Sequence, residues 1–206
     1  MLALLLASCK KNTWTDDSAV IQFQDEKFLQ AILENPRNTV DKNNDGQISE
    51  KEARTATVLD VSLAGISSME EIKYFTSLTE LFCYGNRLTT LDVSRHASLR
   101  QFNCSNNLLE NLDVSACPSL TILNINYNRI SEIDFYANTL LEELYCEDNL
   151  LTLLDLRNNK ELKYLSCSGN KLSRLILYRH HKLGKSTIAE IREEYGDIIE
   201  YEFARP

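Results

Sequence analysis

The feature that most constrains this chain is a sequence repeat of 21 residues. From Leu78 onward, five consecutive blocks carry apolar residues at positions 1, 4, 6, 11, 14 and 16, and asparagine at position 9. The blocks are LTELFCYGNRLTTLDVSRHAS, LRQFNCSNNLLENLDVSACPS, LTILNINYNRISEIDFYANTL, LEELYCEDNLLTLLDLRNNKE and LKYLSCSGNKLSRLILYRHHK. Residues 57–77 fit as a degenerate leading block. Such a period predicts a solenoid, because one short coil cannot bury its apolar side without stacking on neighbours.

Positions 3 to 7 of each block alternate as a short strand does, with positions 4 and 6 inward and positions 3, 5 and 7 outward. Stacked coils place these strands in a parallel sheet with a spacing of about 4.8 Å. The pattern L-x-x-L-x-C-x-x-N-x-L resembles the leucine-rich repeat and recurs in phase. The resemblance implies an α/β repeat fold: a leucine-rich-repeat solenoid with short parallel strands, over an array of residues 57–182 with regular repeats at 78–182.

Two polar columns follow from the repeat. The position-9 asparagines are expected to turn inward and satisfy backbone groups of adjacent coils, since a buried polar group left unpaired costs ~1–3 kcal/mol. They are Asn86, Asn107, Asn128, Asn149 and Asn170. We interpret the position-15 aspartates as turn residues on the convex side, not as catalytic acids, and we expect Asp60 to lead them. They are Asp92, Asp113, Asp134 and Asp155.

Four of the six cysteines, Cys83, Cys104, Cys146 and Cys167, occupy position 6. A metal site would need a short spacing such as C-x-x-C, which is missing. Inward free cysteine behaves as a small hydrophobe, so we interpret these residues as buried thiols. We expect Cys117, beside Pro118, to lie outside this ladder and to be exposed.

Both ends of the array need covering. At residues 183–206, Thr187 and Glu190 suggest a capping box, and we expect a helix followed by a strand at 198–203. At residues 19–56, we expect a short strand at 19–23 and helices at 25–34 and 49–55.

Between those helices, DKNNDGQISEKE (41–52) has the spacing of an EF-hand calcium loop. The expected Ca²⁺ ligands are Asp41, Asn43, Asp45, Gln47 through its carbonyl, Ser49 and Glu52. The alternative is a polar turn followed by a Ser49–Glu52 capping box. Because the sequence has no second loop to pair with this one, we expect a structural calcium ion rather than a sensor.

The start of the chain, MLALLLASC, resembles a bacterial lipobox. It predicts a signal at residues 1–9, lipidation of Cys9 and a tether at 10–18. A secretory signal has a basic start and ~15–30 residues, so we expect the natural start upstream. The alternative is an apolar terminus with an accidental cysteine.

Taken together, VIQFQDEKFLQAILENP, the calcium-like loop and the LDVS-containing repeats resemble bacterial cell-envelope leucine-rich-repeat lipoproteins of internalin-like architecture. The resemblance implies a binding module on the outer membrane, attached to it only through a lipid, with the surface and periplasmic orientations both open.

The outward residues of the strands should form the ligand-binding concave face. Its aromatic, apolar and acidic members are Glu80, Phe82, Tyr84, Ile122, Glu143, Tyr145 and Tyr164. They favour a protein ligand with a basic or hydrophobic segment. A glycan stacked on the tyrosines, or a scaffold without a specific ligand, are the alternatives.

The composition argues against other classes. A net charge of −8 excludes a nucleic-acid binder that needs a basic stripe. The three histidines, His96, His180 and His181, fall at repeat positions 18 to 20, away from the concave face, so no catalytic arrangement is apparent. We expect a non-enzymatic monomer.

Overall fold

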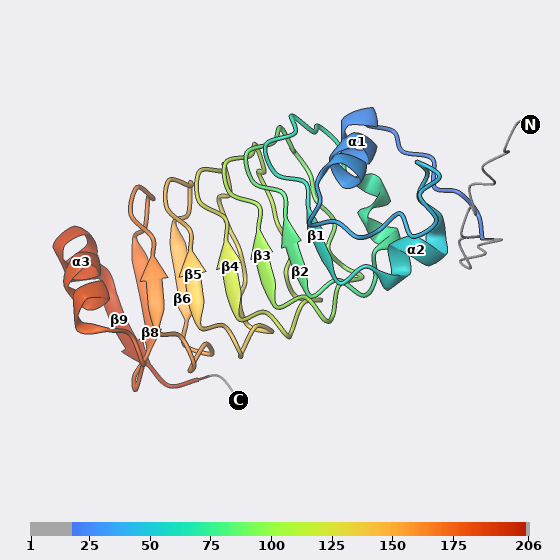
Figure 1. Ribbon diagram of the computed structural model, residues 1–206. Coiled ribbons are helices and arrows are strands. Elements are labelled where there is room, and N and C mark those ends of the chain that lie inside the picture. The colour runs from blue at the N-terminus through green and yellow to red at the C-terminus, as the bar shows by residue number, and fades with distance from the viewer. Residues whose placement is uncertain (1–17, 205–206) are drawn as a thin grey trace, which may run out of the picture.

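The computed structural model describes residues 18–204, and the predicted lipidation residue Cys9 and all of the tether except Ser18 lie outside that part. The described residues form a stack of coils with a six-stranded parallel sheet along one wall (Figure 1). The strands in spatial order are β1 (Val58–Asp60), β2 (Glu80–Phe82), β3 (Gln101–Asn103), β4 (Ile122–Asn124), β5 (Glu143–Tyr145) and β7 (Tyr164–Ser166). The predicted solenoid of parallel strands is confirmed.

Each strand turns its middle residue into the core and its two end residues outward. Leu81, Phe102 and Leu123 are fully buried, whereas their strand neighbours are half-buried. From β2 onward, paired residues lie 21 apart, as Leu81 with Phe102 and Phe102 with Leu123. The side-chain alternation of the strand therefore repeats in phase from coil to coil.

The first step of the sheet differs, because β1 pairs with β2 at a spacing of 22 residues, with Leu59 opposite Leu81. Asp60 consequently lies in the concave sheet opposite Phe82. The expectation that Asp60 leads the position-15 aspartates was wrong: its LDVS-like context resembles theirs, but its strand pairing places it on the other wall.

A second parallel sheet forms only toward the C-terminus. Its strands are β6 (Leu153–Leu156), β8 (Arg174–Tyr178) and β9 (Ile199–Glu202). Helix α3 (Lys185–Tyr195) and the 3-10 turn η2 (Gly196–Ile198) lie between β8 and β9, and α3 packs beside β7 (Figure 1). The N-cap residue of α3 is Gly184, which makes no side-chain hydrogen bond to the helix. Thr187 is the third residue of the helix and is buried, so the expected capping box that starts at Thr187 was wrong.

At the other end lie helix α1 (Glu26–Glu34), helix α2 (Glu50–Thr55) and the 3-10 helix η1 (Glu70–Tyr74). Asp25 is the N-cap of helix α1, and its carboxylate accepts the Lys27 N–H. The helix buries Phe28 and Ile32. The strand expected over residues 19–23 is reduced to one antiparallel bridge between Val20 and Ser49. No helix among residues 18–204 is long and apolar enough to cross a bilayer.

The position-9 asparagines tie consecutive coils together inside the stack. Asn107 Nδ2 donates to the carbonyl oxygens of Cys83 and Cys104, both at 3.0 Å, and its Oδ1 accepts the Leu88 N–H at 3.0 Å. The amides of Asn86, Asn128, Asn149 and Asn170 bridge coils in the same way. The amide side chain thus replaces backbone partners that a turn cannot supply.

A second internal column occupies repeat position 19, which the sequence analysis did not single out. In the first four regular repeats, the side chain at this position approaches a position-16 carbonyl oxygen of the preceding coil, whereas His180 in the fifth repeat is exposed. The contacts are His96 Nε2 to Ile72 at 3.2 Å, Cys117 Sγ to Val93 at 3.5 Å, Asn138 Nδ2 to Val114 at 3.0 Å and Asn159 Nδ2 to Phe135 at 3.1 Å. Cys117 is therefore fully buried, and its expected exposure was wrong.

Candidate functional site

The structure places the seven predicted ligand-binding residues on or directly after the strands of the concave sheet. Six belong to β2, β4, β5 and β7, and Tyr84 follows β2 by two residues. All seven are half-buried, with one side of each exposed. The residues do not form one patch, because β3 and its flanks contribute Gln101, Asn103 and Ser105 between two aromatic groups.

The N-terminal group is centred on Phe82 and Tyr84. Arg37, from the loop after α1, holds its guanidinium carbon 5.1 Å from the centre of the Phe82 ring. The same guanidinium pairs with the Asp60 carboxylate at 2.8 Å. Arg37 is a surface residue that the repeat pattern could not find, because it lies outside the repeats and reaches the sheet through the fold of the N-terminal segment.

The C-terminal group is centred on Tyr145 and Tyr164, whose ring centres are 5.0 Å apart. The Tyr145 hydroxyl donates to Glu143 Oε2 at 2.9 Å. Desolvation, followed by the hydrogen bond to Glu143, raises the pKa of Tyr145 to about 12, so the phenol stays protonated at neutral pH. The group offers a rigid aromatic shelf beside a carboxylate.

A pocket of about 230 Å³ adjoins this group, between the β7 coil and α3. Three carboxylates line it, those of Glu147, Glu190 and Glu194. Glu147 accepts hydrogen bonds from the hydroxyls of Ser166 and Ser168, and Glu194 accepts the Gly169 N–H at 3.0 Å. Glu190 and Glu194 are four residues apart in the sequence, and this spacing predicts that both lie on one face of a helix.

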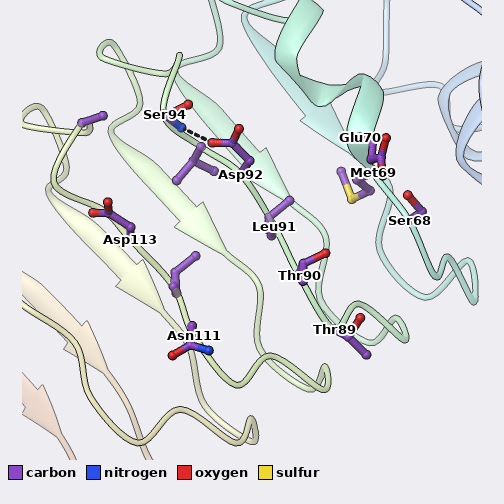
Figure 2. A pocket seen from close by; sticks show the side chains of 13 residues that line it. Ser68, Met69, Glu70, Thr89, Thr90, Leu91, Asp92, Ser94, Asn111 and Asp113 are labelled. Carbon is purple, nitrogen blue, oxygen red and sulfur yellow. Dashed lines mark hydrogen bonds between the residues drawn. The ribbon is translucent and has the colours of Figure 1, made fainter.

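A shallow groove runs along the wall that carries β6. Two adjoining pockets of about 370 and 630 Å³ share Asn111, Leu112 and Asp113. Figure 2 shows side chains of successive coils lining the first of them, among them Leu91, Asp92 and Asp113. The position-15 aspartates accept the N–H two residues on, as Asp92 does from Ser94 at 2.8 Å, so they are turn residues here.

The groups with nucleophilic or acid–base chemistry are dispersed or inert. Burial raises the pKa of Cys117 to about 11 and that of Cys167 to about 12, so both thiols stay protonated. His96 is buried between coils, and burial lowers its pKa. No histidine–acid–nucleophile arrangement forms from these residues.

Five of the six predicted calcium ligands lie on the loop between α1 and α2, and Glu52 lies in the first turn of α2. Asp41 accepts the N–H groups of Asp45 and Gly46, and Asp45 accepts the Gln47 N–H and the Asn43 amide. Asn44 and Gly46 adopt left-handed backbone, with φ of 58° and 76°. Both carboxylates therefore accept hydrogen bonds from residues of their own loop.

Glu52 is the most buried member of this set, with 1% of its surface exposed, and Ser49 is buried beside it. Its Oε1 accepts the Lys42 N–H at 2.8 Å, while Oε2 accepts the Ser49 N–H at 2.9 Å in a capping box. Across residues 18–204, no three His, Cys, Asp or Glu side chains are grouped to hold a metal ion. The carboxylate, amide and hydroxyl oxygens of this loop are ligands that suit a hard cation. To bind one, the carboxylates would have to give up the hydrogen bonds that they accept from backbone N–H groups.

Residues 19–21 lie antiparallel to the end of the loop. The Ile21 N–H donates to the Ile48 carbonyl at 2.8 Å, and the Glu50 N–H donates to the Ala19 carbonyl at 2.9 Å. The loop therefore pairs with the segment that enters the domain, although no second EF-hand loop exists in the sequence.

Comparison with known proteins supports the repeat assignment. A family model described as Leucine Rich repeats (2 copies) matches residues 97–138. The fold is similar to internalin C2 from Listeria monocytogenes, with a TM-score of 0.63 and 16% identity, over 87% of this chain and 94% of that chain. It is also similar to the internalin InlF of that organism, with a TM-score of 0.61 and 22% identity, over 87% of this chain and 55% of that chain. The comparison with curated proteins found no match.

At these identities the likeness concerns the fold alone. The chain carries leucine-rich repeats and has the solenoid fold of the internalin structures. It spans about half the length of InlF.

Proposed function

We propose that this protein is a recognition module that binds a protein partner on its concave sheet. The observation that carries the proposal is the pair formed by Tyr145 and Tyr164, set with Glu143 on an open sheet face. Aromatic residues that are rigidly held and only half-buried are the usual energetic centres of interfaces. Internalin-type leucine-rich repeats serve in protein recognition in general, which supports the same class of function.

A photo-crosslinking experiment tests this function. Benzoylphenylalanine replaces Asn103, at the centre of the concave sheet, or Tyr136, outside that sheet. With envelope and host extracts, with and without calcium, a discrete protein adduct is expected from position 103 and not from 136. Adducts from both positions alike would contradict the proposal. A glycan adduct without any protein adduct would favour the glycan alternative. The absence of both adducts would favour a scaffold without a specific ligand.

We also propose that Ca²⁺ stabilises the N-terminal cap at residues 19–56. Asp41, Asn43, Asp45, Ser49 and Glu52 would supply side-chain oxygens, and Gln47 its carbonyl oxygen. A hard cation with oxygen ligands is what such a donor set suits. The bridge between Val20 and Ser49 supports a clamping role, since an ion in the loop would also hold the entering segment. Isothermal calorimetry of the wild type and the Asp41→Ala variant tests binding, because position 1 of an EF-hand loop requires an aspartate; equal heats would exclude the loop as the site.

We further propose lipid attachment at Cys9 and an outer-membrane location, both supported only by the lipobox-like sequence. Metabolic labelling with an alkyne fatty acid should mark the wild type and not Cys9→Ala. Protease treatment of intact cells then distinguishes the surface orientation, which gives cleavage, from the periplasmic orientation, which gives protection.

A further inference from the structure

The concave sheet carries charge of one sign. Of the fifteen outward residues at positions 3, 5 and 7 of the five regular repeats, three are charged, and all are acidic: Glu80, Glu143 and Glu147. At the N-terminal end of the sheet, Arg37 forms an ion pair with Asp60, and it is the only cation among residues 18–204 that forms one there. Arg37 therefore compensates Asp60, and Glu80 is the one acidic residue at that end without an ion pair among residues 18–204.

The C-terminal end of the same face lacks this compensation. Glu143, Glu147, Glu190 and Glu194 form no ion pair with any of the described residues. Three of the four line the pocket between the β7 coil and α3. Like charges at this density are unfavourable to each other, and a positive group from outside would relieve them.

The pocket has the size and polarity for one cationic side chain. Its volume of about 230 Å³ is below the 300–1,000 Å³ usual for small-molecule sites. Ser166 and Ser168 direct their hydroxyl protons at Glu147 Oε1, which leaves their lone pairs for an incoming donor. The polar lining thus offers acceptors, and an ammonium or guanidinium head offers only donors.

The aromatic shelf continues directly from this pocket. Ser166, which lines the pocket, is paired in the sheet with Tyr145. Tyr145 and Tyr164 therefore flank the approach, where ring faces can hold the aliphatic stem of a long side chain and attract its charged head.

We infer that the C-terminal half of the concave sheet receives an extended, basic segment of a partner protein, with a lysine or arginine head in the pocket formed by Glu147, Glu190 and Glu194. This inference rests on the proposed recognition function and specifies the chemistry of the partner. Charge complementarity selects the occupant, since an acidic or neutral segment would leave the carboxylates uncompensated.

Selection from a random 12-residue peptide library on the full-length protein tests the inference. Enriched peptides should contain more lysine and arginine than the input library. A synthetic copy of the leading peptide should bind about tenfold or more weakly to Glu190→Gln and to the double variant Glu147→Gln/Glu194→Gln. The Glu190 side chain makes no hydrogen bond or ion pair with the residues that the structure describes, so Glu190→Gln is expected to fold normally. It keeps the test valid should the double variant fail to fold.

The matched control is Glu110→Gln/Glu132→Gln, which removes two exposed carboxylates outside the concave sheet. This control should leave binding within about twofold. Equal weakening by the control and the pocket variants would overturn the inference, since net charge alone would then explain binding. If the enriched peptides lack basic residues and their binding is lost in Tyr145→Ala, the inference is overturned and the recognition function stands. No enrichment, or peptides indifferent to every concave substitution, would contradict both.

Discussion

At the residue scale, the stability of the stack depends on polar side chains that are buried in register. The position-9 asparagines each complete hydrogen bonds in two coils, as Asn128 does with Cys104, Ile125 and Leu109. The position-19 column repeats the principle with a different set of side chains. Because both columns are buried, losing one side chain leaves several backbone groups without partners.

Replacing Asn128 by alanine should lower the free energy of unfolding by about 1–3 kcal/mol per backbone group left unpaired. Urea denaturation measures this difference. Asn111→Ala, which removes an exposed asparagine outside the sheet, is the matched control and should change stability by less than about 0.5 kcal/mol. Equal losses for the two variants would contradict the internal role of Asn128.

His96 gives the stack a pH dependence whose sign can be worked out. Burial lowers the pKa of the folded imidazole, against smaller opposing effects of the Val93 and Ile72 backbone and of Asp92. Its Nδ1 has no hydrogen-bond partner in the folded chain, which agrees with an imidazole that is buried in its neutral form. Below pH ~6.5, His96 binds a proton in the unfolded chain but stays neutral in the folded chain. The free energy of unfolding therefore decreases as the pH drops through this value.

The His96→Asn variant, which introduces the residue found at 138 and 159, should remove this part of the pH dependence. Unfolding free energies of the wild type should fall faster than those of the variant between pH 6.5 and 5, by up to about 1.4 kcal/mol per pH unit. His181, whose pKa burial also lowers, is present in both proteins and cancels in the comparison. Parallel curves would show that His96 protonates freely in the folded state.

At the element scale, much of this architecture could be predicted from the sequence. The outward and inward positions of β2, β3, β4, β5 and β7 follow from the two-residue alternation, which puts Phe82, Tyr145 and Tyr164 on the outward face of the sheet. Helix α1 begins one residue from its expected start, because an Asp cap and an apolar stripe are local signals.

Features set by tertiary contact could not be predicted in this way. Asp60 carries the same local motif as the turn aspartates, and only the 22-residue pairing of β1 with β2 moves it to the concave sheet. Cys117 has a proline beside it, yet its repeat position turns it inward. Glu190 and Glu194 join the candidate site because α3 packs beside β7, a placement that no spacing within the helix encodes.

The loop at residues 41–52 yields a prediction for the N-terminal elements. If its dissociation constant for calcium is near 10⁻⁴ M, 10 mM Ca²⁺ should stabilise the folded state by about 2.7 kcal/mol. Melting temperatures in calcium and in chelator measure the difference. Asp41→Ala removes the aspartate that an EF-hand loop requires at its first position and should abolish the increment. Asp197→Ala removes an exposed carboxylate near the other end and should retain it. Equal melting of the wild type with calcium and with chelator would rule the clamp out.

At the scale of the whole molecule, stacking converts a 21-residue pattern into a continuous face. Each outward residue lies beside its counterpart in the next coil, so side chains far apart in the sequence form one surface. That surface is divided: Arg37 and Asp60 neutralise each other beside Phe82, while the end near Tyr145 and Tyr164 keeps its acidic charge. Most of the acidic charge that has no ion pair on this face is therefore at the C-terminal half, where the inferred basic segment would dock.

The most direct test of this account is the affinity of a partner identified by crosslinking for three forms of the protein. Tyr145→Ala should weaken binding by about tenfold or more relative to the wild type, and Tyr136→Ala should not, while all three melt within about 2 °C of one another. Unchanged affinity in a stably folded Tyr145→Ala variant, or an equal loss in Tyr136→Ala, would contradict the assignment of the concave sheet as the binding surface.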